Sequence, residues 1–75
     1  KAHIQWVYND ENVARYLVYK SEKNQALTLY RSVKSPVNYF DDNQVLPGKE
    51  YVYRLKVIFE SGVESPLSKA IELKF

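Results

Sequence analysis

The stretch Glu50–Phe59 reads EYVYRLKVIF, and it decides the fold class. One of its two alternating faces carries Tyr51, Tyr53, Leu55, Val57 and Phe59, and the other carries Val52, Arg54, Lys56 and Ile58. Because successive side chains of a strand point to opposite sides, this period of two predicts a long β-strand with its first face buried. Turn signals enclose it, with Leu46-Pro47-Gly48 before the strand and Ser61-Gly62 after it.

The rest of the chain repeats this pattern in shorter segments. We expect five more strands, over about residues 2–7, 14–21, 26–33, 37–41 and 70–75, separated by polar turns that include 9–12, 22–25 and 41–43. In the third, Leu27, Leu29 and Tyr30 break the alternation, which a bulge or an edge position would explain. No stretch has helical periodicity. The sequence therefore predicts an all-β sandwich that forms one domain over residues 1–75.

Composition excludes several classes of protein. The 75 residues carry 11 Lys and Arg against 9 Asp and Glu, a net charge of +2, which is too balanced for a partner of bare nucleic acid or of an anionic membrane. The chain has no cysteine for a disulfide or a thiolate metal site, and its two glycines cannot form a phosphate-binding loop. No apolar run reaches membrane-spanning length and no signal peptide is recognisable. We expect no cofactor, no bound metal, no nucleic acid partner and no membrane insertion.

The second half of the chain resembles the fibronectin type III module. In that family an apolar residue and then Pro-Gly lead into a tyrosine that starts the long strand F, and Val45, Pro47, Gly48 and Tyr51 match those positions. The loop to strand G in many members has the pattern matched here by Gly62, Glu64, Ser65, Pro66 and Ser68.

The first half extends the resemblance to nearly the whole chain. Trp6 lies where the family has its strand B tryptophan, the run from Tyr16 to Ser21 is similar to strand C of bacterial members, and Tyr39 with Asp41 resembles strand E and the following turn. The family has roughly twenty residues, including strand A, before that tryptophan, whereas five precede Trp6 here. Strand A is therefore expected to be missing, which leaves the strand B edge open to strand addition, either by upstream residues or by a second chain.

The resemblance implies an immunoglobulin-like Greek-key β-sandwich in a secreted or cell-surface multidomain protein of bacterial type. It implies structural roles for Trp6 in the core, for Tyr51 as a tyrosine corner bonded to the backbone near Val45–Pro47, and for Pro47 and Gly48 in the corner itself. The implied function is non-enzymatic: a protein-interaction module, as in adhesins that bind host matrix proteins. The alternative is a passive spacer in an extracellular enzyme such as a glycoside hydrolase.

Two candidate chemical sites have simpler interpretations. His3 is the only histidine and lacks a nucleophile in an appropriate motif, so we interpret it as a solvated residue. The acidic pairs Asp10-Glu11 and Asp41-Asp42 lack the ligand spacing of a calcium loop, and we interpret both as turns. No catalytic residue is predicted.

The remaining candidate is a binding surface. The inward rings Trp6, Tyr16, Tyr39, Tyr51 and Tyr53 are expected in the core. The outward residues of strands C and F form a mixed apolar and basic stripe, made of Leu17, Tyr19, Val52, Arg54, Lys56 and Ile58. An exposed apolar patch can mark a contact site, although scattered surface apolar residues are normal. Within this stripe Tyr19, Arg54, Lys56 and Ile58 are the candidate protein-binding residues.

Overall fold

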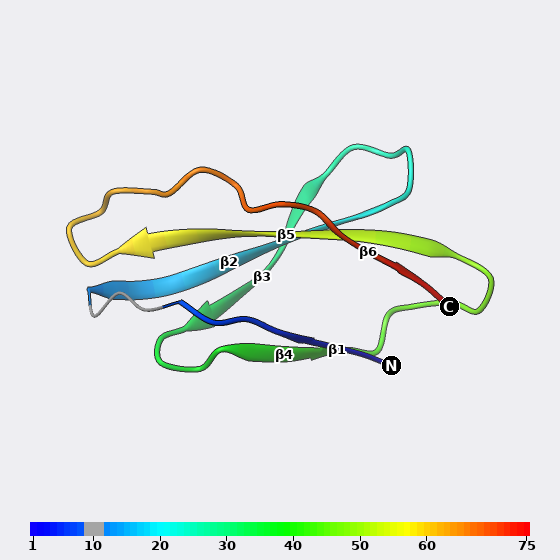
Figure 1. Ribbon diagram of the computed structural model, residues 1–75, viewed down its shortest axis with the longest axis horizontal. Coiled ribbons are helices and arrows are strands. Elements are labelled where there is room, and N and C mark those ends of the chain that lie inside the picture. The colour runs from blue at the N-terminus through cyan, green and yellow to red at the C-terminus, as the bar shows by residue number, and fades with distance from the viewer. Residues whose placement is uncertain (9–11) are drawn as a thin grey trace.

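The computed structural model describes residues 1–8 and 12–75 and contains six strands in two antiparallel sheets (Figure 1). The strands are β1 (Ala2–Gln5), β2 (Val13–Glu22), β3 (Thr28–Lys34), β4 (Tyr39–Asp42), β5 (Glu50–Phe59) and β6 (Ile71–Lys74). One sheet has the order β1-β4 and the other the order β3-β2-β5-β6. The prediction of an all-β protein is confirmed. The described residues contain no helix of the length and apolar character needed to cross a membrane.

The two ten-residue strands β2 and β5 form the centre of the larger sheet. They pair antiparallel from Val13 opposite Phe59 to Glu22 opposite Tyr51. Their alternation places Tyr16 and Val18 on the same inward face as Tyr53 and Val57, and all four side chains are buried. The period-two pattern of the sequence thus sets which face of the larger sheet meets the smaller one.

Aromatic rings join the two sheets across the core. The Trp6 ring meets the Tyr16 ring edge to face at 5.2 Å between centroids, and Phe40 of β4 meets Tyr53 of β5 at 6.2 Å. Ala2 and Ile4 of β1 fill the space beside them, and each is 3% exposed. Trp6 belongs to the same inward series, although β1 ends one residue before it. Edge-to-face packing of large rings adds to the area that this small core buries.

The irregular third strand is both an edge strand and bulged. The predicted range 26–33 becomes β3, Thr28–Lys34, and among the described strands β3 pairs only with β2. Arg31 lies opposite Val18 while Leu29 lies opposite Tyr19, so Tyr30 is an extra residue in the ladder. The bulge lets Tyr30 turn toward the smaller sheet, where its ring packs against Phe40.

The fourth strand corrects two predictions. Tyr39 was expected in the core, but it is 48% exposed and stacks on His3, whereas Phe40 faces inward. Asp42 was assigned to a turn, but it is the last residue of β4 and is 2% exposed. Tyr39 and Phe40 are adjacent apolar residues, so a short strand could adopt either phase, and a change of one residue exchanges the two faces.

The last segment reaches β6 along the edge of β5. The Ser65 and Ser68 hydroxyls accept hydrogen bonds from the main-chain N–H groups of Val57 and Leu55, both at 2.8 Å. The main-chain N–H groups of Ser65 and Ser68 also donate to the carbonyls of Val57 and Leu55, at 2.9 and 2.8 Å, so this segment is bonded to β5 before β6 begins at Ile71. Ile71 lies opposite the buried Tyr53, but it is 38% exposed because it borders the open side of the sandwich.

Candidate functional site

The four candidate residues Tyr19, Arg54, Lys56 and Ile58 share the outer face of the larger sheet. Tyr19 lies directly opposite Arg54, Leu17 opposite Lys56, and Arg15 opposite Ile58. All four candidates are half-buried, since neighbours on the sheet cover part of each side chain. We call this set the outer stripe. The structure brings its members together, because β2 and β5 are adjacent and in the register that alternation requires.

The two basic groups of the outer stripe have different surroundings. Lys56 Nζ lies 3.2 Å from Glu64 Oε1 and 5.8 Å from the centroid of the Tyr19 ring. Arg54 forms no ion pair with any residue that the structure describes. The positive charge of Lys56 is therefore partly neutralised within the chain, while the guanidinium of Arg54 remains available to an outside carboxylate.

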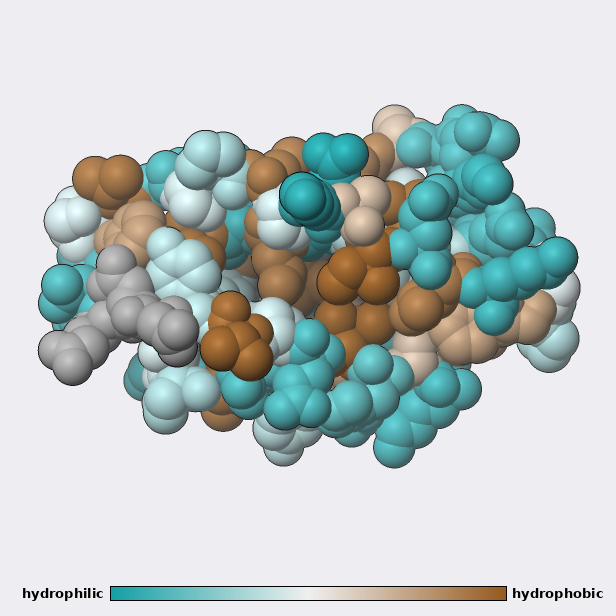
Figure 2. Space-filling view, in the orientation of Figure 1, coloured by the Kyte–Doolittle hydropathy of each residue, from teal (hydrophilic) through white to brown (hydrophobic). Residues whose placement is uncertain are grey.

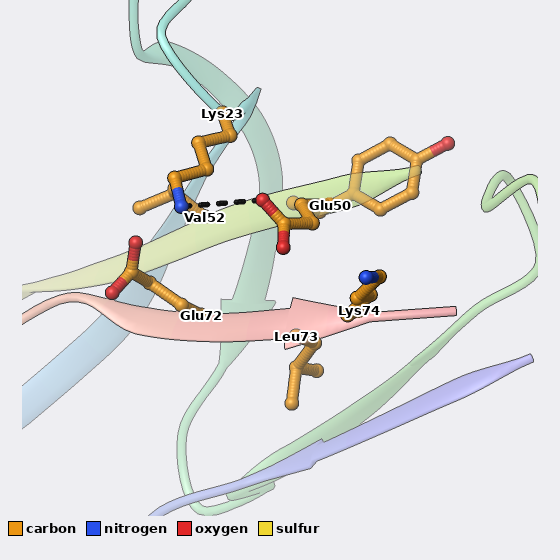
Figure 3. A pocket seen from close by; sticks show the side chains of 7 residues that line it. Lys23, Glu50, Val52, Glu72, Leu73 and Lys74 are labelled. Atoms are coloured by element: carbon orange, nitrogen blue, oxygen red, sulfur yellow. Dashed lines mark ion pairs between the residues drawn. The ribbon is translucent and has the colours of Figure 1, made fainter. Parts of the chain in front are cut away.

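A shallow hollow of about 180 Å³ continues the outer stripe to the place where β5 begins and β6 ends (Figure 3). Lys23, from the β2–β3 turn, reaches over Val52 to Glu50, with Nζ and Oε2 3.3 Å apart. Glu72 lies on the neighbouring strand, directly opposite Val52. The hollow mixes both signs of charge on exposed side chains, so it offers recognition of a polar surface rather than of one small ion.

The residues expected to have structural roles occupy the corner and the core. Tyr51 is 5% exposed, and its Oη accepts a hydrogen bond of 2.9 Å from the Leu46 N–H. Gly48 has a φ of 81°, a conformation that side chains disfavour, and its N–H bonds to the carbonyl of Phe75. Pro47 precedes it in the same turn. Trp6 is 9% exposed.

Sequence reasoning missed a buried charged cluster between the sheets. Asp42 Oδ2 lies 2.7 Å from Lys20 Nζ and accepts a hydrogen bond of 2.7 Å from Tyr53 Oη. Asp42 Oδ1 accepts bonds from Tyr30 Oη at 2.8 Å and from the Gln44 N–H at 2.9 Å. We call Lys20, Tyr30, Asp42 and Tyr53 the ion cluster. Its members come from four different strands, so the cluster ties both sheets together.

Electrostatics hold the ion cluster in its charged form. Burial by itself would raise the pKa of Asp42, but the hydrogen bonds from Lys20, Tyr53, Gln44 and Tyr30 lower it from 3.8 to about 2. Burial and the hydrogen bond to Asp42 raise the pKa of both Tyr53 and Tyr30 above the usual 10.0. The phenols therefore stay protonated as donors to the carboxylate.

Aromatic rings enclose the ammonium of the ion cluster. Lys20 Nζ lies 4.5 Å from the centroid of the Tyr30 ring and 4.7 Å from that of Tyr51, and it donates to the Gln44 carbonyl at 2.6 Å. The ring faces and the carboxylate together replace the water that this cation loses on burial. This arrangement is suited to holding strands in place.

The weaker candidates from the sequence lie on exposed surface. His3 Nδ1 is 2.7 Å from Asp41 Oδ1, and the hydrogen bond from His3 lowers the pKa of that carboxyl. The pair Asp10-Glu11 lies outside the described residues. Among the described residues, no group of three or more His, Cys, Asp or Glu side chains is placed to hold a metal ion.

Comparison with known proteins does not assign the chain to a family. The chain matches no protein-family model, and no curated protein is significantly similar to it.

Proposed function

We propose that this chain is a β-sandwich module of the fibronectin type III kind, within a longer secreted or surface protein, and that it binds a protein partner without catalysis. The fold supports this proposal through its two antiparallel sheets and through the Tyr51–Leu46 hydrogen bond, which has the form of a tyrosine corner. The alternative, a passive spacer, requires the same fold but no binding surface.

The observation that carries the binding proposal is the pairing of Tyr19 with Arg54 on the open face of the larger sheet. Tyrosine and arginine are over-represented among residues that dominate binding energy, and a sheet holds them in fixed positions. Ile58 adds apolar area on the same face. Since Arg54 has no carboxylate partner among the described residues, the partner surface should carry acidic side chains beside an apolar patch.

A binding assay with matched charge variants tests this proposal. The immobilised chain is screened against purified extracellular matrix proteins, with Arg54→Glu and Lys34→Glu as variants that change the net charge equally. We expect at least one matrix protein to bind, Arg54→Glu to weaken that binding about tenfold or more, and Lys34→Glu to have little effect. If no matrix protein binds, or if both variants behave alike, the outer stripe is not the binding surface.

A further inference from the structure

A second surface, separate from the outer stripe, lies along the free edge of β1. The smaller sheet consists of β1 and β4, and no described strand pairs with the other side of β1. The Trp6 N–H bonds to the Asn38 carbonyl at 3.0 Å, in register with Ile4 opposite Phe40. Because bonded and non-bonded pairs alternate in an antiparallel ladder, the main-chain groups of His3 and Gln5 point away from β4.

An apolar cleft opens where the chain leaves β1, at Trp6. It measures about 560 Å³ and is lined by Trp6, Tyr16, Leu55, Val57, Pro66 and Ile71 together with short polar residues and one lysine. Figure 2 shows the apolar surface gathered in the middle of this face, between the positions of β1 and β6 in Figure 1. Val7 and Tyr8, which follow β1, also line the cleft and are 82% and 42% exposed. The inner faces of the two sheets are thus left uncovered along one side.

The opposite side of the sandwich differs. There Tyr30 of β3 contacts Phe40 of β4 and donates to Asp42, so side chains fill the space between the sheets. A second cleft on that side, of about 460 Å³, has the charged residues Lys20 and Glu22 in its lining, whereas apolar residues predominate in the cleft near β1.

Trp6 supplies a third and independent observation. It lines the cleft and is 9% exposed, and its Nε1 is buried without a hydrogen-bond partner among the described residues. A buried donor without an acceptor is costly, and most tryptophans of this kind find one. An added strand would bring main-chain carbonyls to this part of the sandwich.

We propose that the β1 edge and its cleft bind an extended segment of a partner polypeptide by strand addition. Main-chain hydrogen bonds to His3 and Gln5 would give affinity, and alternate apolar side chains of the segment would enter the cleft. Among the described residues that line the cleft, Lys69 has the only charged side chain. The segment should therefore carry a carboxylate among its polar positions.

This charge argues against a second copy of the chain as the occupant. The β1 strand of another copy, with its flanking residues 1–8, would bring Lys1 and His3 but no carboxylate toward Lys69. Like charges at close range are unfavourable, whereas an acidic strand gains a partner. An alternating apolar and acidic strand of a partner protein therefore suits the cleft better than the β1 strand of a second copy does.

Nuclear magnetic resonance of the labelled chain tests the proposal with a defined probe. The probe is a blocked eight-residue peptide that alternates valine with serine and has one central glutamate, and its partner probe has lysine instead. At about 1 mM glutamate peptide we expect shifts at the His3 and Gln5 amides and at the Trp6 indole N–H. Absence of shifts up to about 10 mM, or shifts confined to other strands, would overturn the proposal.

Two variants, each with a control, distinguish the main-chain pairing at the β1 edge from the charge preference of the cleft. Gln5→Pro removes an N–H that faces away from β4, so the fold should persist while peptide affinity falls about tenfold or more, and Gln5→Ala is the matched control that keeps the N–H. Lys69→Glu should reverse the preference between the two peptides, which provides a test even if the proline variant unfolds. Arg54→Glu should leave peptide binding unchanged. If sedimentation shows a dimer that Gln5→Pro abolishes, or if Lys69→Glu does not alter the preference, the assignment of an acidic partner strand is wrong.

Discussion

Lys20 Nζ lies 2.7 Å from Asp42 Oδ2, and the side chains of both residues are withdrawn from solvent, at 10% and 1% exposure. A charge removed from water is costly unless it is paired, so each of these residues depends on the other. Four of the six strands meet at this one carboxylate through Lys20, Tyr30 and Tyr53. The stability of the sandwich should therefore respond to changes here more than to changes at any exposed ion pair.

Replacing Asp42 with asparagine should destabilise the chain strongly. The change leaves the Lys20 ammonium buried without its counter-charge, and we expect a loss of about 3–5 kcal/mol in the free energy of unfolding. Urea denaturation followed by circular dichroism measures this loss. The matched control is Glu50→Gln, which breaks the exposed pair with Lys23 and should cost about 1 kcal/mol or less. Equal effects of the two changes would show that the ion cluster is not a special contributor.

Acid should weaken the fold through the same carboxylate. The pKa of Asp42 is about 2 in the folded chain against 3.8 ordinarily, so ionised Asp42 stabilises the fold above pH 4. This contribution, about 2 kcal/mol, is lost as the pH falls from about 4 through about 2. The measurement compares the free energy of unfolding of the native chain and of Asp42→Asn over this range. The native chain should lose more stability on acidification, and parallel curves would contradict the assignment.

Removing the Tyr51 hydroxyl should weaken the corner that precedes β5. Tyr51→Phe keeps the buried ring but leaves the Leu46 N–H without its acceptor, and we expect a loss of about 1–3 kcal/mol. Tyr39→Phe serves as the control, because that ring is 48% exposed and its hydroxyl has no hydrogen bond to a described residue. Thermal unfolding of both variants gives the comparison. If the stability of Tyr51→Phe equals that of the native chain, the hydrogen bond of the corner does not stabilise the fold.

The single tryptophan reports directly on the core. Trp6 is 9% exposed and packs on Tyr16, so its fluorescence should be blue-shifted and resistant to iodide quenching in the folded chain. Trp6→Ala should cost roughly 3–5 kcal/mol, enough to unfold a domain of this size. Trp6→Phe retains a ring and should lose less. Red-shifted emission that iodide quenches readily would place the residue outside the core.

The two long strands could be predicted because their alternation extends over many residues. In β5, Tyr51, Tyr53 and Val57 are buried while Arg54 and Lys56 face outward, as the pattern requires. The short β4 offered two adjacent apolar residues, Tyr39 and Phe40, and its phase depends on contacts with distant strands. Length is therefore what made the alternation decisive.

The ion cluster shows why the rest could not be predicted. Lys20 has the same parity in β2 as Tyr16 and Val18, which was a signal for its inward direction. A lysine or an aspartate alone favours solvent, however, and burial becomes favourable only when the two meet across the sheets. The proximity of Tyr19 and Arg54, by contrast, could be predicted from the alternation, because β2 and β5 were assumed to be adjacent strands. The ion pair between Lys56 and Glu64 depends on the path of a loop.

The extra residue in β3 also limits how that strand can align. Sliding β3 by one position along β2 would carry the Tyr30 hydroxyl away from Asp42 and turn Val33 from the core toward water. The buried Asp42 carboxylate is costly when it loses its hydrogen-bond donors, so a misaligned pairing of β3 is destabilised. We infer that Asp42 fixes the alignment of β3 more than it adds to the stability of the native fold. Deleting Leu29, which restores an even ladder, should leave a β-rich chain that gives several sets of resonances for β3. A single sharp set would show that the alignment is fixed elsewhere.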